Sequence, residues 1–448
     1  MYSSFFVLYK FTKKYRIHNI YKLHKERWVE MKNYIIEGGK ELKGEVNISG
    51  SKNAALPIMA ASILNKGITK LYNVPNIHDT KIMLEILQIL GCKIKKNSDK
   101  IVIDSRNIKQ FEIPENLMRE MRSSVILAGS ILGIHKKVKL SYPGGCDIGA
   151  RPIDLHIKAF KKLGINVIEE SGYINCDCEK IVGNEITLDF PSVGATENAI
   201  LASVLSEGVT TIENAAMEPE IVDLQNFLNK MGAKISGAGS KTIIIKGVTK
   251  LKDVSYNIMP DRIEAGTFLC IVAASGGEAK LNNVVPEHLV PIISKLEEYG
   301  SKIEIEKNTI TIKASKKNKS VDIKTMPYPG FPTDMQSIFA SMLTTAKGTS
   351  IIVENIFENR YKYVPELNRM GAKIVIEGKA AVIKGVRKLY AASVKCTDLR
   401  GGAALVLAGL IAKGKTKISN IEYILRGYEN LDMKLRKLGA NIIIEEGE

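Results

Sequence analysis

The segment 143–152 has the composition of a functional loop with potentially reactive residues. It reads Pro-Gly-Gly-Cys-Asp-Ile-Gly-Ala-Arg-Pro, so Cys146 lies among three glycines and five residues before Arg151. Glycines suit tight turns or a close approach of the main chain to a ligand. A nearby guanidinium favours the thiolate form of a cysteine and attracts anionic substrates. We therefore predict a ligand-facing loop, and the alternative is a surface turn that carries an incidental thiol.

Two other segments have residue types that suit an anionic ligand. Lys52 and Asn53 follow an expected strand and open an apolar stretch, so Ser51 is expected to cap a helix whose first turn can seat an anion. A lysine at a helix start is, however, often only solvated. Asp334 follows Pro-Thr and precedes an apolar run, which is also typical of a helix cap.

Length, composition and charge limit the possible classes of protein. The chain has 448 residues, 45% of them apolar and 25% charged, which indicates a globular protein of about two domains. Its formal net charge is +16. Lysines are spread along the chain without a run of five basic residues or interleaved aromatics, which disfavours a nucleic-acid groove and favours attraction of small anions.

The cysteines and the N-terminal segment bear on location. Six scattered cysteines without a secretory signal indicate reduced thiols in a cytoplasm, and the Cys176–Cys178 pair lacks the partners of a metal site. The apolar stretch 5–9 is too short to cross a membrane. Residues 25–28 can be encoded by a purine-rich stretch like a ribosome-binding site, so we expect residues 1–30 to be a non-native, disordered leader before Met31.

The remaining chain repeats one phrase six times. A helical apolar pattern ends at a glycine that is followed by a strand of alternating apolar residues and a return strand. The glycine is expected to terminate each helix in the left-handed conformation. These glycines, which are 73, 68, 68, 71 and 68 residues apart, are Gly91, Gly164, Gly232, Gly300, Gly371 and Gly439.

Each unit is expected to be roughly βαβαββ and to close with a hairpin. Six units divide most simply into two α/β domains of three, with a crossover expected in 247–262. A cleft between two such domains is the natural place for a ligand.

The sequence resembles the enolpyruvyl transferases over its whole length from Met31. The matching segments lie in the same order as in that family, and the cysteine loop is one of them. They are 48–55, 121–124, 143–152, 192–196, 213–216, 218–223, 260–264, 331–336, 357–360, 397–400 and 426–429. The resemblance implies two inside-out α/β barrels joined by a double crossover. Residues 52–259 would form the N-terminal domain, residues 31–51 and 260–448 the C-terminal domain, and the active site would lie in the cleft between them.

The resemblance also implies a reaction. The enolpyruvyl group of phosphoenolpyruvate would be transferred to the 3′-hydroxyl of UDP-N-acetylglucosamine, with release of phosphate by addition and elimination. This is the first committed step of peptidoglycan precursor synthesis. No cofactor or metal is expected, nor a nucleic-acid or membrane partner, and the enzyme would be a cytoplasmic monomer or weak homo-oligomer. The alternatives are a 5-enolpyruvylshikimate-3-phosphate synthase and a basic, repeat-built RNA-binding protein.

Site residues follow by carrying the family motifs onto this sequence. Cys146 would protonate the vinyl carbon, form an adduct with phosphoenolpyruvate and be alkylated by fosfomycin, and Asp334 would be the base or anchor for the sugar hydroxyl. The catalytic set is Cys146, Asp334, Lys52 and Arg400. The phosphoenolpyruvate set is Lys52, Asn53, Arg151, Arg360, Arg400 and Arg426. The nucleotide-sugar set is Asn53, Arg122, Arg151, Pro152, Ile153, Asp154, Leu155, Ser192, Val193, Gly194, Asp334 and Ile356. Glu218, Asp261 and Asp398 would help to position these side chains.

Overall fold

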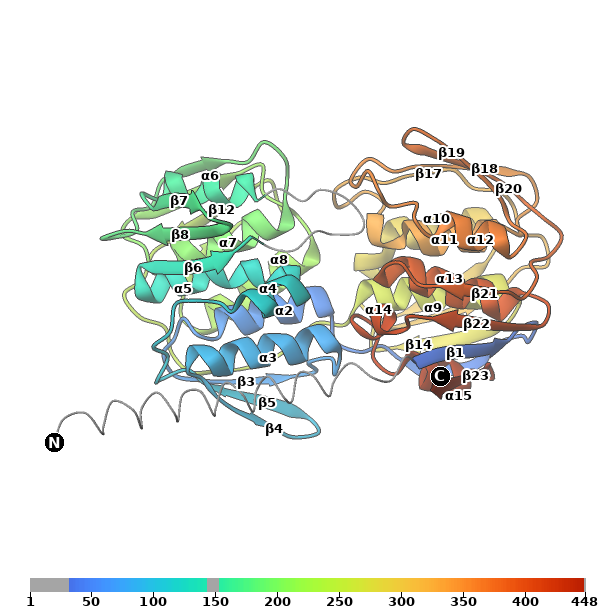
Figure 1. Cartoon of the computed structure of the whole chain (residues 1–448), viewed down its shortest axis with the longest axis horizontal. Coiled ribbons are helices and arrows are strands. Elements are labelled where there is room, and N and C mark those ends of the chain that lie inside the picture. The colour runs from blue at the N-terminus through green and yellow to red at the C-terminus, as the bar shows by residue number, and fades with distance from the viewer. Residues whose placement is uncertain (1–31, 143–152, 447–448) are drawn as a thin grey trace.

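The computed structural model describes residues 32–142 and 153–446, which form two halves side by side (Figure 1). Residues 1–30 and the cysteine loop 143–152 therefore lie outside the described residues. Within the described residues, no helix is long and apolar enough to span a membrane.

The first half has helices surrounded by three sheets. In the order of their paired strands, the sheets are β13 (Val254–Asn257), β3 (Ile68–Tyr72), β5 (Lys100–Asp104) and β4 (Lys93–Lys96); β6 (Lys137–Ser141), β8 (Tyr173–Asp177) and β7 (Asn166–Glu170); and β11 (Lys234–Ser236), β12 (Thr242–Lys246), β10 (Val209–Glu213) and β9 (Glu185–Thr187). The helices are α2 (Lys52–Ala61), α3 (His78–Leu90), α4 (Glu115–Glu120), η1 (Arg122–Ile126), α5 (Leu127–His135), α6 (Asp154–Lys162), α7 (Val193–Ser203) and α8 (Pro219–Lys230).

The second half repeats this plan. Its sheets are β15 (Lys302–Glu306), β16 (Thr309–Lys313), β14 (Glu278–Asn282) and β2 (Lys43–Asn47); β17 (Ile323–Lys324), β18 (Thr349–Val353), β20 (Ala380–Lys384) and β19 (Lys373–Glu377); and β21 (Ser393–Lys395), β22 (Lys415–Ser419), β1 (Lys32–Glu37) and β23 (Asn441–Glu446). Its helices are α9 (Arg262–Ser275), η2 (Pro286–Leu289), α10 (Val290–Tyr299), η3 (Thr333–Met335), α11 (Gln336–Leu343), α12 (Val364–Arg369), α13 (Leu399–Ile411), α14 (Glu422–Leu425) and α15 (Leu431–Lys437).

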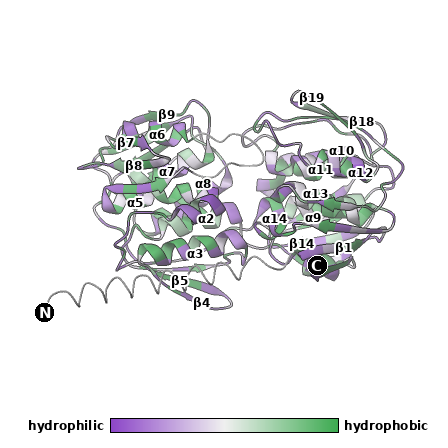
Figure 2. Cartoon of the chain, in the orientation of Figure 1, coloured by the Kyte–Doolittle hydropathy of each residue, from purple (hydrophilic) through white to green (hydrophobic). Residues whose placement is uncertain are grey.

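Buried helices occupy the centre of each half. In the second half α9, α11 and α13 pack against one another, and nearly every residue of all three is buried. In the first half α5 packs between α2 and α7. Helices that are apolar on every side must be enclosed, so the sheets lie outside them. This arrangement confirms the predicted inside-out barrels. Figure 2 shows hydrophilic residues at α14 and at the start of α2, where the halves face each other.

The repeat unit is observed as predicted, with one correction. All six repeat glycines have positive φ, between 79° and 118°, which confirms their expected left-handed conformation. The prediction that every unit closes with its own hairpin is wrong for the sixth unit. There β23 pairs with β1 instead, because the N-terminal strand fills the position that a return strand takes in the other units.

The two halves exchange strands at the crossover. β2 precedes α2 in the chain but pairs with β14 of the second half, whereas β13 precedes α9 but pairs with β3 of the first half. The two crossing segments form a bridge between Gly50 and Pro260. A Cβ atom at Gly50 would lie 1.7 Å from the carbonyl oxygen of Asn73, so only glycine allows this close passage.

Two hydrophobic clusters correspond to the two halves. One contains buried residues between Ala54 and Met259, and the other contains buried residues from Tyr34 to Ile48 and from Ile263 to Ile442. The domain boundaries expected from the sequence, at residues 51/52 and 259/260, stay a prediction.

A buried carboxyl group near the crossover should make the stability of the protein depend on pH. Asp223 on α8 accepts hydrogen bonds from the Tyr256 hydroxyl at 2.7 Å and the Met259 amide at 3.3 Å. Burial nevertheless raises the pKa of Asp223 to about 6, so folding favours its protonated form. Its contribution to stability is therefore fully present below the unfolded pKa of about 4 and is lost as the pH rises through 6.

We expect Asp223→Asn to remove this titration. The unfolding free energy of the wild type relative to the variant should fall by about 1 kcal/mol between pH 5 and pH 7. Urea unfolding at both pH values measures the difference, with Asp99→Asn on the exposed β4–β5 turn as the control. A difference that does not change with pH would contradict the expectation.

Candidate active site

Asp334 lies between two arginines in the second half. Its Oδ1 accepts a hydrogen bond from Arg360 Nη2 at 2.8 Å, and its Oδ2 accepts one from Arg400 Nη2 at 3.0 Å. Asp334 belongs to η3, Arg360 precedes α12, and Arg400 is the second residue of α13. Three segments that are distant in sequence therefore meet at one carboxylate.

The charges around Asp334 fix its ionisation. Burial raises the pKa of Asp334, but the charges of Arg400, Arg360 and Lys52 outweigh burial and hold the pKa well below its usual range. The free protein therefore has a carboxylate here at any physiological pH. The helix-cap interpretation of Asp334 is wrong, because its carboxylate binds the two arginines and η3 has no side-chain cap.

Arg360 and Arg400 both have hydrogen-bond donors that are not used within the described residues. Both side chains are only 3% exposed. Among the described residues, Arg360 Nε and Arg400 Nε and Nη1 have no hydrogen-bond partner. Buried donors of this kind are costly unless a ligand satisfies them, and a guanidinium matches a carboxylate through two parallel hydrogen bonds. The pair can thus receive an additional anionic group.

A second group of charges joins the two halves. Asp79, at the start of α3, accepts a hydrogen bond from Arg426 Nε at 2.9 Å and lies 3.6 Å from Lys52 Nζ. Burial lowers the pKa of Lys52, and the charges of Arg400 and Arg426 lower it further, while Asp79 opposes them. Lys52 lies in the first half. Its pKa is thus influenced both by the charges around Asp334 and by the charges around Asp79.

Helix caps hold these cations in place. Ser51 caps α2, which begins with Lys52, and Asn53 is the next residue of that helix. Asp398 caps α13 by accepting hydrogen bonds from the amides of Arg400 and Gly401. Asp261 caps α9 and also accepts a hydrogen bond from the Lys52 amide at 3.1 Å. Asp261 thereby connects the start of α2 to the second half.

The proposed nucleotide-sugar residues gather mainly at another point of the first half. Ser192 caps α7, so Val193 and Gly194 form its first turn. A Cβ atom at Gly194 would lie 3.1 Å from His156, so the glycine lets α6 pack closely against α7. Ile153 occupies the N-cap position of α6 without a side-chain hydrogen bond, and Asp154 and Leu155 begin the helix. The starts of two helices thus lie together.

Arg122 adds positive charge near these helix starts. Burial, together with the charge of Arg122, lowers the pKa of His156 to about 4. The imidazole is therefore neutral at pH 7 and shares a hydrogen bond with Asn198 on α7 at 2.8 Å. The cationic side chain at this point is Arg122, while His156 has a packing role between the helices.

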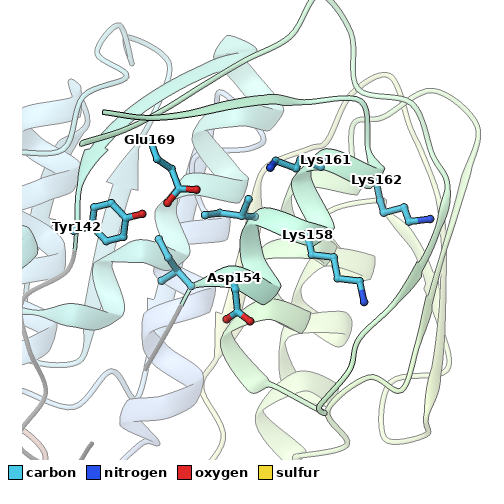
Figure 3. A pocket seen from close by; sticks show the side chains of 8 residues that line it. Tyr142, Asp154, Lys158, Lys161, Lys162 and Glu169 are labelled. Carbon is cyan, nitrogen blue, oxygen red and sulfur yellow. The ribbon is translucent and has the colours of Figure 1, made fainter. Parts of the chain in front are cut away.

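A pocket of about 580 Å³ lies beside α6 (Figure 3). Figure 3 shows Tyr142 and Glu169 on one side and Lys158, Lys161 and Lys162 along the helix. Its described lining includes Ile153 and Asp154 of the nucleotide-sugar set but none of the charged residues around Asp334.

Three predicted site residues, Cys146, Arg151 and Pro152, lie outside the described residues. Ile356 belongs to the second half, and its amide donates a hydrogen bond to Glu354 at 2.8 Å.

Sequence reasoning missed three buried acidic residues at the site. Asp79 resembles an ordinary acidic residue in the first turn of a helix, and Glu354 follows a strand, where a charged residue is usually solvated. Glu220 pairs with Arg262 at 3.0 Å, and this ion pair connects α8 of the first half to α9 of the second. Charge alone gave no signal, because Arg426 and Arg262, the partners of Asp79 and Glu220, are far away in sequence, and so are the two threonines that contact Glu354.

Known proteins are similar to this chain in sequence and in fold. A family model described as EPSP synthase (3-phosphoshikimate 1-carboxyvinyltransferase) matches residues 36–435. UDP-N-acetylglucosamine 1-carboxyvinyltransferase 2 of Caldanaerobacter subterraneus subsp. tengcongensis is 53% identical, over 92% of this chain and 99% of the relative. UDP-N-acetylglucosamine 1-carboxyvinyltransferase of Clostridium botulinum is 49% identical, over 91% of this chain and 98% of the relative.

Solved structures share the fold at low sequence identity. The enolpyruvyl transferase NikO from Streptomyces tendae has a TM-score of 0.85 at 23% identity, covering 94% of this chain and all of that one. EPSP synthase from Acinetobacter baumannii has a TM-score of 0.73 at 18% identity, covering 93% of this chain and all of that one. The family prediction is confirmed, and the chain belongs to the EPSP synthase family of enolpyruvyl transferases.

Proposed function

We propose that this chain transfers the enolpyruvyl group of phosphoenolpyruvate to the 3′-hydroxyl of UDP-N-acetylglucosamine and releases phosphate. The reaction would begin peptidoglycan precursor synthesis. The observation that carries the proposal is the carboxylate of Asp334 between Arg360 and Arg400, which have unused buried donors. The nucleotide-sugar acceptor is supported by relatives about half identical to this chain.

The arginines would hold the carboxylate of phosphoenolpyruvate. Arg360 Nε and Arg400 Nε and Nη1 supply the donors, and both guanidiniums are fixed by their bonds to Asp334. Lys52, Asn53, Arg426 and Arg151 would hold the phosphate. Lys52 and Arg426 already share Asp79, which keeps these cations of opposite halves near each other.

The chemical step needs an acid and a base. In the addition, Cys146 would protonate C3 of phosphoenolpyruvate, Asp334 would accept the proton of the 3′-hydroxyl, and the sugar oxygen would bond to C2. In the elimination, C3 would return a proton to the Cys146 thiolate, the bond between C2 and the phosphate oxygen would break, and phosphate would leave with the proton that Asp334 had accepted. Desolvated cations would stabilise the charge that moves to the phosphate.

The nucleotide sugar would bind across the halves. Arg122 and the starts of α6 and α7 would hold the uridine diphosphate, since helix N-termini favour anions. Asp334 and Ile356 would contact the sugar from the second half. We propose that the enzyme acts in the cytoplasm as a monomer or weak homo-oligomer.

An assay of phosphate release tests this function. We expect phosphate from phosphoenolpyruvate with UDP-N-acetylglucosamine and none with shikimate 3-phosphate, because the residues around α6 and α7 would bind a nucleotide. Product mass should increase by one enolpyruvyl group. Activity with shikimate 3-phosphate alone would instead support the sibling synthase.

A further inference from the structure

Glu354 joins three segments of the proposed site through one buried carboxylate. It follows β18 and is 2% exposed. Its Oε1 accepts hydrogen bonds from the Thr325 hydroxyl at 2.9 Å and from the amides of Ile356 at 2.8 Å and Phe357 at 3.1 Å. Its Oε2 accepts one from the Thr333 hydroxyl at 3.0 Å. Both oxygens of this carboxylate are therefore engaged.

The partners of Glu354 adjoin the residues that would do chemistry. Thr333 directly precedes Asp334, and Phe357 lies three residues before Arg360. Arg360 Nη2 in turn donates to the Thr333 carbonyl at 3.2 Å and to Asp334. Glu354 thus closes a ring of contacts in which the η3 segment and the 356–360 loop are fixed relative to each other.

Thr325 extends this ring to the end of β17. Its hydroxyl donates to Glu354 and accepts a hydrogen bond from the Asn355 amide at 2.9 Å, while the Asn355 side chain donates to the Thr325 carbonyl at 3.0 Å. Because Thr325 is fully buried, these bonds are shielded from water. The loop that carries Ile356 and Arg360 is thereby tied to the sheet as well as to η3.

We propose that Glu354 is a positioning residue for the enolpyruvyl transfer, acting through Asp334, Ile356 and Arg360. This inference rests on the proposed function. Its hydrogen bonds hold the carboxylate of Asp334 and the guanidinium of Arg360 in register, so that both meet the reacting groups. Misplacement of a catalytic group by about 1 Å can cost about 100-fold in rate.

Two substitutions separate hydrogen bonding from charge. In Glu354→Gln the amide oxygen can replace Oε1, and the amide nitrogen can donate to Thr333 Oγ, whose hydroxyl can reverse its role. Glu354→Ala leaves the buried amides of Ile356 and Phe357 without their acceptor. Thr333→Val removes only the bond to η3 and preserves the shape of the side chain.

The experiment measures kcat and KM for both substrates and hydrogen exchange at the Ile356 and Phe357 amides. The exposed residue Glu377 on β19 supplies the control, Glu377→Ala. We expect kcat to fall about 100-fold in Glu354→Ala, with faster exchange at both amides. Glu354→Gln should stay within about fivefold of the wild type, and Thr333→Val should lower kcat about tenfold with little change in KM.

The outcomes distinguish this inference from the proposed function. A wild type without phosphate release from the two substrates refutes the function, while slower exchange in Glu354→Gln than in Glu354→Ala still supports the anchoring. An active wild type whose Glu354→Ala variant keeps its kcat overturns the positioning role. Equal damage in Glu354→Gln and Glu354→Ala overturns it too. If Glu354→Ala does not fold, unchanged kcat in Thr333→Val overturns it.

Discussion

Asp334→Asn should lower kcat by about three orders of magnitude while the protein still binds the nucleotide sugar. The amide keeps the size of the carboxylate but cannot accept the proton of the 3′-hydroxyl, and general-base catalysis contributes about 10²–10⁴-fold. Asparagine is the better test than alanine, because it leaves an oxygen that can still accept a hydrogen bond from one of the two buried arginines.

The charge environment makes this prediction more specific. In the free protein Asp334 is a weak base, because Arg400, Arg360 and Lys52 hold its pKa below the usual range. When the carboxylate of phosphoenolpyruvate shares the two guanidiniums, part of that compensation is lost and the basicity of Asp334 should increase. Substrate binding would thereby activate the base.

The pH dependence of the rate checks this activation. The acidic limb of kcat reports the enzyme–substrate complex, and that of kcat/KM reports the free enzyme. We expect the limb that depends on Asp334 to lie at higher pH in the kcat profile, and to be missing in Asp334→Asn. Asp99→Asn is the control. If Asp334→Asn kept kcat within tenfold, Asp334 would not be the base.

Local signals in the sequence predicted the repeat and its helix ends. Gly91 and its five counterparts predicted where helices end, because only glycine adopts the left-handed conformation cheaply. The pairing of β1 with β23 could not be read in this way, since the two strands lie at opposite ends of the described chain. The alternation of apolar and polar residues indicates a strand in the sequence, but it does not indicate which other strand pairs with it.

The residues of the candidate site also differ in whether a local sequence signal could reveal them. Asp334 was predicted as a site residue, but its local context, Pro-Thr-Asp before an apolar run, also indicated a helix cap. The two arginines that exclude the cap lie 26 and 66 residues away. Asp79 and Glu354 were missed because Arg426, which binds Asp79, and the threonines that bind Glu354 come from other segments. A carboxylate has no sequence signal until such partners are known.

Arg400→Lys should lower kcat/KM for phosphoenolpyruvate by about 10²–10³-fold and leave the affinity for the nucleotide sugar nearly unchanged. Lysine keeps a charge for Asp334, but it lacks the planar fork whose Nε and Nη1 would bind the substrate carboxylate. A hydrogen bond to a charged group contributes about 1.5–3 kcal/mol. Because the ammonium group keeps part of the attraction, we expect the loss of two bonds near the lower end of this range, about 3–4 kcal/mol in total, which corresponds to that decrease.

The control for this variant is Arg369→Lys, since Arg369 has a side chain that is 63% exposed and pairs only loosely with Glu366, at 3.6 Å. Steady-state kinetics with each substrate varied in turn, together with calorimetric binding of UDP-N-acetylglucosamine, separates the two sites. An equal loss of affinity for phosphoenolpyruvate and for UDP-N-acetylglucosamine would mean that Arg400 instead maintains the structure of the whole site. Loss confined to phosphoenolpyruvate would support the unused donors of Arg400 as the receptor of its carboxylate, because the lysine keeps a positive charge beside Asp334 but has no guanidinium fork.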